Sequence, residues 1–325
     1  MNIPCGREDI ARLFQNCISG DKLAQAYIIR GDEGMGKKTV VNYILSLMLC
    51  REHTSSGNCL SCKSHEKGVH PDVVELRRAP DRASLGVDRV RDIKTEVYTR
   101  ATMADYKAVV VYEAHLATVE AQNAMLKMIE EPPEKVVFFI LCDTLAPILQ
   151  TIISRSVTIE LTPLSHKDLR RIFGETVEDF ELSLCEGNPG RFIKLHGDGD
   201  YMSLRDKVID LFSTLSGEDS YAPYAIVTEL DKIKENKNEV WSIMLVFARD
   251  AYYRKMGLDS NIINKDKLNY IDAFSRNLSP ETCWKIADNI INAYKEKGKN
   301  GNFYIAMSVL LLKCRSEINK NKRKR

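Results

Sequence analysis

Short apolar runs alternate with amphipathic stretches over the first half of the chain. The runs have the length of buried strands, and the stretches at 87–101 and 118–131 carry apolar residues at helical spacing. Strands that alternate with helices predict a parallel sheet with helices on both faces. The runs interpreted as strands are 24–30, 72–76, 107–115, 135–143 and 156–161. The site of such a sheet lies beyond the carboxyl ends of its strands, which places Tyr112-Glu113 and Asp143-Thr144 along one edge with the segment after residue 30.

The pattern changes to helices alone after residue 162. Residues 163–202 read as short helices with a Gly-Asn-Pro-Gly break at 187–190. From residue 203 apolar positions recur every three and four residues, which is typical of amphipathic helices packed on each other. The sequence therefore predicts an α/β domain over 1–162, a small helical domain over 163–202 and an all-helical domain over 203–325.

Composition and charge narrow the class of protein. The chain has 325 residues, of which 44% are hydrophobic, and a formal net charge of +2. That near balance of charge excludes a protein whose whole surface carries charge of mainly one sign. Any contact with nucleic acid therefore has to come from local basic patches. The basic stretch 319–325 is one such patch, and we interpret it as a disordered, solvated end rather than a DNA contact. Residues 1–20 lack an apolar signal core, and nine cysteines then indicate a reducing, cytoplasmic location.

A glycine-rich loop stands between the first strand and the helical stretch 39–50. Three glycines let the backbone turn its N–H groups toward an anion, and Lys37 can reach the outer phosphates of a nucleotide. An ordinary strand-to-helix turn is the alternative. Active loops place Ser or Thr after the lysine to hold Mg²⁺, whereas this chain has Lys38 there, with Thr39 on another helix face. The candidate nucleotide-binding residues are Gly31, Gly34, Gly36, Lys37, Lys38 and Thr39.

A second departure affects the same site. A phosphoryl-transfer site of this type ends a neighbouring strand with Asp, which supports Mg²⁺. The strand at 107–111 is followed instead by Tyr112, and then by Glu113, whose carboxylate can still act as a base on water. Two independent losses predict a site that holds ATP or ADP, if at all, without hydrolysing it.

Three cysteines and a histidine form a metal-ligand pattern after the first helix. Cys50, Cys59, Cys62 and His65 give the spacing C-x8-C-x2-C-x2-H, which matches a closed tetrahedral Zn²⁺ site. The polar segment between the first two cysteines has no core of its own, and a metal supplies the missing order. Free thiols on a loop are the alternative. The fourth ligand rests on spacing alone, because His53 and His70 are also near.

Four long motifs resemble one known family. They are "GVHPDVVEL" (68–76), "SLGVDRVRDI" (84–93), "VEAQNAMLKMIEEPPEKVVFFIL" (119–141) and "ILQTIISRSVTIEL" (148–161). Over roughly residues 1–195 the chain resembles the clamp-loader branch of the AAA+ ATPases, and within it the delta-prime subunits of bacterial DNA polymerase III. The resemblance implies an AAA+ P-loop domain with a zinc module at 50–65, a small helical lid at 163–202 and a helical collar at 203–325. Family members usually have a fourth cysteine where His65 stands.

The resemblance also implies a function and partners. Delta-prime subunits resemble a rigid stator in a hetero-pentamer with gamma/tau-type ATPase subunits and the delta subunit, which loads the sliding clamp onto primer-template DNA. Ser154-Arg155-Ser156 matches the family triplet whose arginine points at ATP on the neighbouring subunit, so Arg155 is the candidate catalytic residue, acting in trans. A structural arginine paired within the domain is the alternative. Arg191 falls near the lid arginine that touches a γ-phosphate, or is merely solvated.

Two other functions stay open at this point. One is an active ATPase, either a motor subunit of the clamp loader or a free-standing P-loop enzyme, which Lys38 and Tyr112 disfavour. The other is a free zinc-dependent nucleic-acid binder, which predicts a more basic domain than this one.

Overall fold

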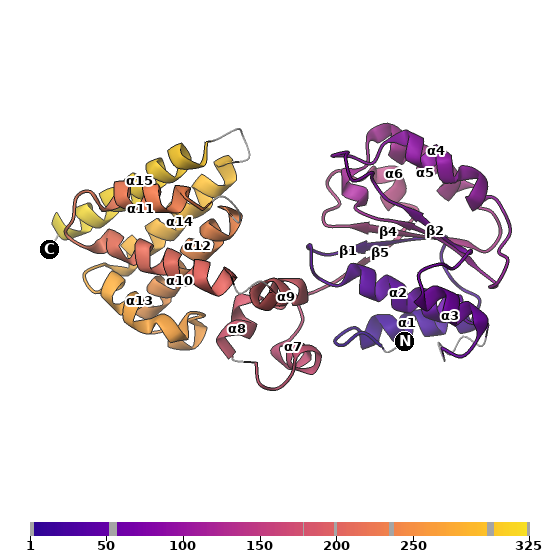
Figure 1. Cartoon of the computed structure of the whole chain (residues 1–325), viewed down its shortest axis with the longest axis horizontal. Coiled ribbons are helices and arrows are strands. Elements are labelled where there is room, and N and C mark those ends of the chain that lie inside the picture. The colour runs from indigo at the N-terminus through magenta and orange to yellow at the C-terminus, as the bar shows by residue number, and fades with distance from the viewer. Residues whose placement is uncertain are drawn as a thin grey trace. The chain divides into compact units, whose positions relative to one another are not determined.

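The computed structural model describes residues 3–51, 57–177, 179–197, 200–233, 237–297 and 302–323. The chain divides into two compact units, which are described one at a time (Figure 1). The first unit comprises Met1–Val177 and Cys185–Arg191, and the second comprises Glu178–Leu184 and Phe192–Arg325. Residues 163–202 are therefore shared between the two units, whereas the sequence predicts a separate small helical domain for them.

The first unit is built on a five-stranded parallel sheet. Its strands are β1 (Ala26–Arg30), β2 (Val73–Leu76), β3 (Lys107–Val111), β4 (Val136–Cys142) and β5 (Val157–Glu160), in the order β2-β3-β4-β1-β5. The predicted parallel α/β sheet is thus confirmed. β3 and β4 are buried along their whole length, because helices cover both faces of the sheet. The carboxyl ends of all five strands consequently share one edge.

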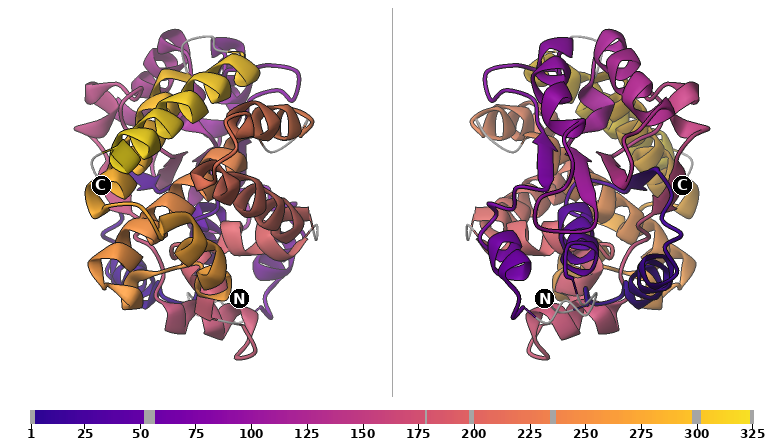
Figure 2. Two further views of the ribbon diagram at one scale, coloured as in Figure 1. Left: turned by 90° about the vertical axis from the view of Figure 1, so that its left-hand side faces the viewer. Right: turned by 90° about the vertical axis from the view of Figure 1, so that its right-hand side faces the viewer.

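Helices form a layer on each face of this sheet, as Figures 1 and 2 show. One layer holds α1 (Glu8–Ser19), α2 (Lys37–Met48) and α3 (Leu60–Glu66), and the other holds α4 (Val87–Val97), α5 (Val119–Glu130) and α6 (Gln150–Ile153). Phe138 and Phe139 are neighbours on β4 and point to opposite faces, as the pleat requires. Phe139 belongs to the core under α1 and α2, and Phe138 to the core under α4 and α5. The uninterrupted apolar run of β4 therefore reflects burial on both sides.

Three short helices follow β5. α7 (His166–Phe173) lies in the first unit and is capped by Ser165, whose hydroxyl accepts a hydrogen bond from the Asp168 N–H at 3.1 Å. α8 (Asp179–Leu184) belongs to the second unit. α9 (Pro189–Gly197) begins in the first unit, at the proline of the Gly-Asn-Pro-Gly break predicted from the sequence.

The second unit is helical throughout its described residues, which confirms the all-helical region. Its helices after α9 are α10 (Asp200–Ser213), α11 (Ala222–Asp231), α12 (Lys237–Met256), α13 (Leu268–Ser275), α14 (Pro280–Lys297) and α15 (Phe303–Arg323). Stacked and edge-on rings of Phe212, Phe247 and Phe274 lie at the centre of its core. Among the described residues, no helix combines the length and the apolar character that crossing a membrane demands.

The last helix changes one expectation. α15 runs to Arg323, so residues 319–323 continue a helix, although the sequence analysis interpreted 319–325 as a disordered end. Lys and Arg are favourable in the last turn of a helix, where the dipole is negative. An ion pair between Lys320 and Glu317 at 2.6 Å, three residues apart on the helix, adds support. The final two residues lie outside the described residues.

Candidate functional site

The glycine loop lies at the carboxyl edge of the sheet, between β1 and α2. Gly36 is the residue before α2 and has φ of +84°, a left-handed conformation that favours glycine. A Cβ atom at this position would meet nothing within 4 Å, so the loop surrounds open space. Lys37 is the first residue of α2, and Lys38 and Thr39 lie exposed on the same turn. The predicted loop residues thus lie together at the carboxyl edge of the sheet, in a turn that leads into the first turn of α2.

The ammonium group of Lys37 is bonded within its own chain. Its Nζ donates to the carbonyl oxygens of Gly31 at 2.5 Å and Asp32 at 2.9 Å, and to Oδ1 of Asp143 at 2.6 Å. An ammonium group has three donors, and all three are used. Asp143 directly follows β4, so a carboxylate from the neighbouring strand stands against the lysine that the sequence assigns to phosphate.

His115 fixes the other side of this carboxylate. It lies in a short 3₁₀ helix, η1 (Ala114–Leu116), and its Nδ1 accepts a hydrogen bond from the Asp143 N–H at 3.2 Å. Its Nε2 lies 3.6 Å from Oδ2 of Asp143. Sequence reasoning places Asp143 at the site edge and does not find this arrangement, because side-chain pairs between separate strands leave no periodic signal.

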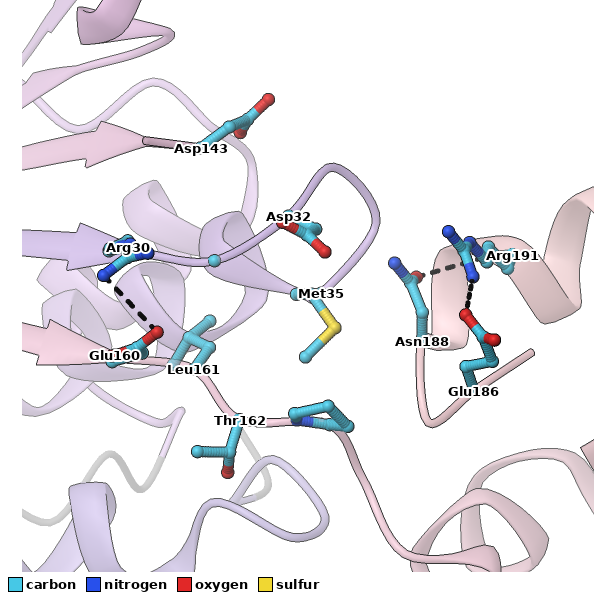
Figure 3. Close-up of a pocket in the computed structure, with 12 residues that line it drawn as sticks. Arg30, Asp32, Met35, Asp143, Glu160, Leu161, Thr162, Glu186, Asn188 and Arg191 are labelled. Atoms are coloured by element: carbon cyan, nitrogen blue, oxygen red, sulfur yellow. Dashed lines mark hydrogen bonds and ion pairs between the residues drawn. The ribbon is translucent and has the colours of Figure 1, made fainter. Parts of the chain in front are cut away.

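A cavity of about 320 Å³ opens beside the glycine loop (Figure 3). Its two arginines are both paired with carboxylates of the same chain. Arg30 lies 3.5 Å from Glu160 across β1 and β5, and Arg191 lies 2.5 Å from Glu186. Arg191, the candidate lid arginine, therefore lines the cavity and is held there by an ion pair.

Asn188 in the Gly-Asn-Pro-Gly break joins this break to the glycine loop. Its Nδ2 donates to the Glu33 carbonyl at 2.8 Å, and the N–H of Gly190 donates to the Gly34 carbonyl at 2.9 Å. Backbone approaches backbone so closely here that a side chain at position 190 would collide with Gly34. The glycines at 34 and 190 are thus explained by close packing.

Tyr112 and Glu113, which follow β3, also have partners in their own chain. The Tyr112 hydroxyl donates to Oε1 of Glu75 at 2.8 Å, and the guanidinium of Arg77 lies 3.4 Å from the centre of its ring. Burial, and then the Glu75 carboxylate, raise the pKa of Tyr112, so the phenol stays neutral. Oε2 of Glu113 accepts a hydrogen bond from Nε of Arg78 at 2.9 Å. A neutral phenol thus follows β3 at the position where the sequence analysis expects an aspartate that supports Mg²⁺.

Three cysteines converge on one point between α2 and α3. The sulfur atoms of Cys50, Cys59 and Cys62 all lie within 4.8 Å of one another. Cys59 precedes α3, and its sulfur accepts a hydrogen bond from the Cys62 N–H at 3.3 Å. Burial and the neighbouring thiols raise the pKa of Cys62 to about 12. The cluster can hold a metal ion, since a bound cation displaces such protons.

His65 lies outside this converging group in the structure. Its Nε2 lies 3.0 Å from the Asn42 carbonyl, which directs the ring toward α2. His70 is also engaged elsewhere, because Nε2 bonds Ser61 Oγ at 2.7 Å and Nδ1 accepts from the N–H of Asp72. His53 lies outside the described residues. Spacing places His65 within reach of the cysteines but does not set the direction of its ring.

Arg155 lies between α6 and β5, at the opposite end of the sheet from the glycine loop. The loop follows the end of β1, whereas Arg155 precedes the start of β5, and the two strands are parallel neighbours. One guanidinium nitrogen lies 3.1 Å from Oε1 of Glu130, and another donates to the Thr151 carbonyl at 3.1 Å. The side chain is 45% exposed. It therefore faces solvent and cannot serve the nucleotide site of its own chain.

Asp72 is a structural residue that the sequence does not reveal. Its buried carboxylate accepts hydrogen bonds from the backbone N–H groups of Thr102, Met103 and Ala104, at 2.7, 2.7 and 2.9 Å, and from the Thr102 hydroxyl. These bonds fix the loop that leads into β3. A His-Pro-Asp turn before a strand is the only sign in the sequence, and a solvated turn has the same sign.

Comparison with known proteins places the chain in a family. The family described as "DNA polymerase III, delta subunit" matches residues 6–165, and the one described as "DNA polymerase III, delta subunit, C terminal" matches residues 200–315. DNA polymerase III subunit delta' of Bacillus subtilis is 26% identical over 274 residues, which cover 82% of this chain and 81% of that one. Subunit delta' of Escherichia coli is 26% identical over 298 residues, which cover 88% and 86%. The chain belongs to the delta-prime family of DNA polymerase III subunits.

The share of each chain that is matched separates the delta-prime family from subunit tau. DNA polymerase III subunit tau of Bacillus subtilis is 30% identical over 211 residues, but these cover 63% of this chain and 37% of tau. The matches to delta' of Bacillus subtilis and of Escherichia coli extend over both units instead. The resemblance read from the sequence is thus confirmed, and the first family match includes the glycine loop, the cysteine cluster and Arg155.

Proposed function

We propose that this chain is the non-hydrolysing delta-prime subunit of a DNA polymerase III clamp loader in the bacterial cytoplasm. It helps to place the sliding clamp on primed DNA, and it supplies Arg155 in trans to ATP bound by the adjacent ATPase subunit. The observation that carries this proposal is the match to delta-prime subunits over both units of the chain.

Two substitutions and one ion pair around the loop support the absence of ATP hydrolysis. Lys37 is bonded to Asp143, and Lys38 stands where a hydroxyl would hold Mg²⁺. Tyr112 stands where a carboxylate would support the same ion and is a neutral hydrogen-bond donor. Phosphoryl transfer relies on Mg²⁺ to neutralise developing charge, so the loop keeps its shape without its activity.

The role of Arg155 follows from its position and its chemistry. It is exposed at the end of the sheet away from its own loop, and its guanidinium presents a rigid fork of donors that matches phosphate oxygens. An exposed pair with Glu130 contributes about 0–1 kcal/mol, so a phosphate can displace it at small cost. Arg155 therefore suits a nucleotide held by a neighbouring subunit.

Assembly with other subunits fits the exposed apolar residues of the second unit. Trp284, Ile291 and Tyr294 lie on α14, and Ile305, Val309 and Leu312 lie on α15, each set at helical spacing. Apolar faces of this kind favour burial against a partner. We assign as partners the gamma/tau-type ATPase subunits and the delta subunit, in a hetero-pentamer that contacts the clamp and primer-template DNA.

The cysteine cluster serves a structural role in this proposal. Cys50, Cys59 and Cys62 supply three thiolates to one Zn²⁺, and a fourth ligand closes the site so that no catalytic water remains. His65 and His53 are the two candidates for that ligand. If His65 is the ligand, its ring must rotate away from the Asn42 carbonyl.

Reconstitution tests the proposed function. The chain is purified alone and with gamma/tau-type and delta subunits, and ATP hydrolysis and clamp loading onto primed DNA are measured with and without it. We expect a stable complex, no turnover by the isolated chain, and loss of clamp loading when the chain is left out. A complex that forms and loads clamps equally well without it contradicts the proposal.

An active motor subunit is the second candidate function. The 30% identity to tau favours it. It requires ATP turnover by the isolated chain that disappears in Lys37→Ala, so the same measurements separate the two functions.

A further inference from the structure

Lys37 has a carboxylate where a phosphate is expected. We propose that Asp143 sets the affinity of the glycine loop for nucleoside polyphosphates, because it occupies Lys37 in the place of a phosphate oxygen. The inference rests on the proposed function only in treating this loop as a nucleotide site that no longer hydrolyses. It names the residue that decides whether ADP or ATP enters the site.

The ion pair is strong for geometric reasons. The Nζ–Oδ1 distance of 2.6 Å is typical of a charge-assisted hydrogen bond, which is about twice as strong as a neutral one. The Lys37 side chain is only 14% exposed, so water screens the pair less than it screens a surface pair. His115 holds the backbone of Asp143 through the Nδ1 bond, and its Nε2 faces the second carboxylate oxygen. Lys37 thus bonds one carboxylate oxygen of Asp143, and His115 lies near the other.

The charges around the cavity also oppose the binding of a polyphosphate. Four carboxylates line the cavity, and its two arginines are already paired with two of them. These carboxylates are Asp32, Asp143, Glu160 and Glu186. Figure 3 shows Asp143 at the end of its strand, beside the loop. A polyphosphate that binds Lys37 from this cavity must displace Asp143 from the ammonium group and then lie next to the displaced carboxylate.

Removal of the carboxylate should therefore restore binding. ADP and ATP are titrated into the isolated full-length chain by calorimetry, with the wild type, Asp143→Asn and Asp143→Ser compared. We expect both variants to bind ADP about 10- to 100-fold more tightly than the wild type, the range that one charge-assisted hydrogen bond corresponds to. The gain should disappear when Lys37→Ala is combined with Asp143→Asn, because the freed ammonium group is its source.

Asp32→Asn is the matched control. Asp32 lines the same cavity, but only its carbonyl oxygen bonds Lys37. If a general reduction of negative charge raised the affinity for ADP, the variants at Asp32 and at Asp143 would both show it. Release of Lys37 occurs only in the variants at Asp143. An equal gain in Asp32→Asn, or no gain in either Asp143 variant, overturns the inference. So does a wild-type chain that binds ADP as tightly as Asp143→Asn.

A measurement on the unmodified chain covers variants that fail to fold. Acetylation of Lys37 is followed by mass spectrometry with and without ADP at about 1 mM, the upper end of ordinary substrate constants. We expect no protection by ADP in the wild type, and protection of Lys37 by ADP overturns the inference. These measurements use the isolated chain, whereas the role of Arg155 is measured only in the assembled complex. A negative result for Asp143 therefore leaves the proposed function of the subunit untouched, and the reverse also holds.

Discussion

The guanidinium of Arg155 lies 3.1 Å from the Glu130 carboxylate, at the end of the sheet opposite the glycine loop of the same chain. Both side chains are about half exposed, and pairs of this kind contribute little to stability. Glu130 ends α5, so it orients the arginine without burying it. The pair therefore orients Arg155 and leaves its guanidinium partly exposed, as the proposed role in trans requires.

Replacement of Glu130 separates this interpretation from a structural ion pair. Glu130→Gln should keep ATP hydrolysis by the assembled complex within about twofold of normal, and it should lower the free energy of unfolding by less than about 1 kcal/mol. The measurements are steady-state hydrolysis and urea unfolding. Activity as low as that of Arg155→Ala would mean that the ion pair itself, rather than a free guanidinium, is what the complex needs.

Metal content tests the cysteine cluster. Protein purified without chelator should contain about one Zn²⁺ per chain, the stoichiometry of a single tetrahedral site, and Cys59→Ser with Cys62→Ser should abolish it and lower the melting temperature. Metal analysis and thermal unfolding give the result. Cys5→Ser is the control, because Cys5 lies outside the cluster. A zinc content near zero in the wild type would contradict the site.

The fourth ligand has its own test. If His65 is that ligand, His65→Ala weakens Zn²⁺ binding by about 10-fold or more in competition with a chelator. If the His65 ring stays on the Asn42 carbonyl, the affinity is unchanged, and His53→Ala should have the effect instead.

Restoring the lost hydroxyl should not restore catalysis. Lys38→Thr supplies a Mg²⁺ ligand at its usual place, but Tyr112 and the Lys37–Asp143 pair remain. We expect the wild type and Lys38→Thr to turn over ATP far more slowly than about 1 s⁻¹, the low end for working phosphoryl-transfer enzymes. A coupled assay on the isolated chain measures this. Turnover near that value in either protein, abolished by Lys37→Ala, would show an active site.

The sequence predicts the frame of the molecule better than its contacts. Five apolar runs and the glycine spacing indicate the strands and the loop, because burial on both faces and a left-handed turn limit the residues allowed. Lys37 and Asp143 are 106 residues apart, and no periodic pattern links them. The direction of the His65 ring is likewise set by Asn42 on another helix. Side-chain pairing depends on packing that a single sequence does not display.

Asp72 should make stability depend on pH. Burial opposes its charge, but the hydrogen bonds from Thr102, Met103 and Ala104 outweigh this and lower its pKa. A lowered pKa stabilises the fold above the unfolded value of about 3.9, and this contribution is lost as pH falls through the folded value. Asp72→Ala should cost about 3 kcal/mol at neutral pH, since it leaves buried N–H groups without acceptors.

The pH profile of unfolding separates this effect from general acid denaturation. The difference between the wild type and Asp72→Ala in urea should shrink below about pH 4, where the unfolded chain begins to protonate Asp72, and should be lost once the pH falls below the lowered pKa of the folded protein. Asp88→Asn is the control, because Asp88 is exposed on α4 and forms an ion pair with Arg91 of the same helix. A difference that is constant with pH would show that Asp72 acts through packing rather than charge.

The two replacements of Arg155 should reduce ATP hydrolysis by the assembled complex to different extents. Arg155→Ala removes the donor fork, and Arg155→Lys keeps a charge that cannot bind phosphate in a bidentate way. The complex with Arg155→Lys should therefore hydrolyse ATP at a rate between that of the complex with Arg155→Ala and that of the wild-type complex. Arg91→Ala removes another exposed arginine that is paired within its own helix, so it is the matched control.

Single-turnover ATP hydrolysis by the reconstituted clamp-loader complex tests the central claim most directly. With Arg155→Ala, we expect the complex to assemble normally and one ATP site, the one next to this subunit, to slow by about 10³-fold, the low end for arginines supplied in trans. Clamp loading should slow with it, and Arg91→Ala should match the wild type. Hydrolysis at all sites and clamp loading at the normal rate in Arg155→Ala would contradict a trans-acting arginine and leave this subunit as scaffold alone.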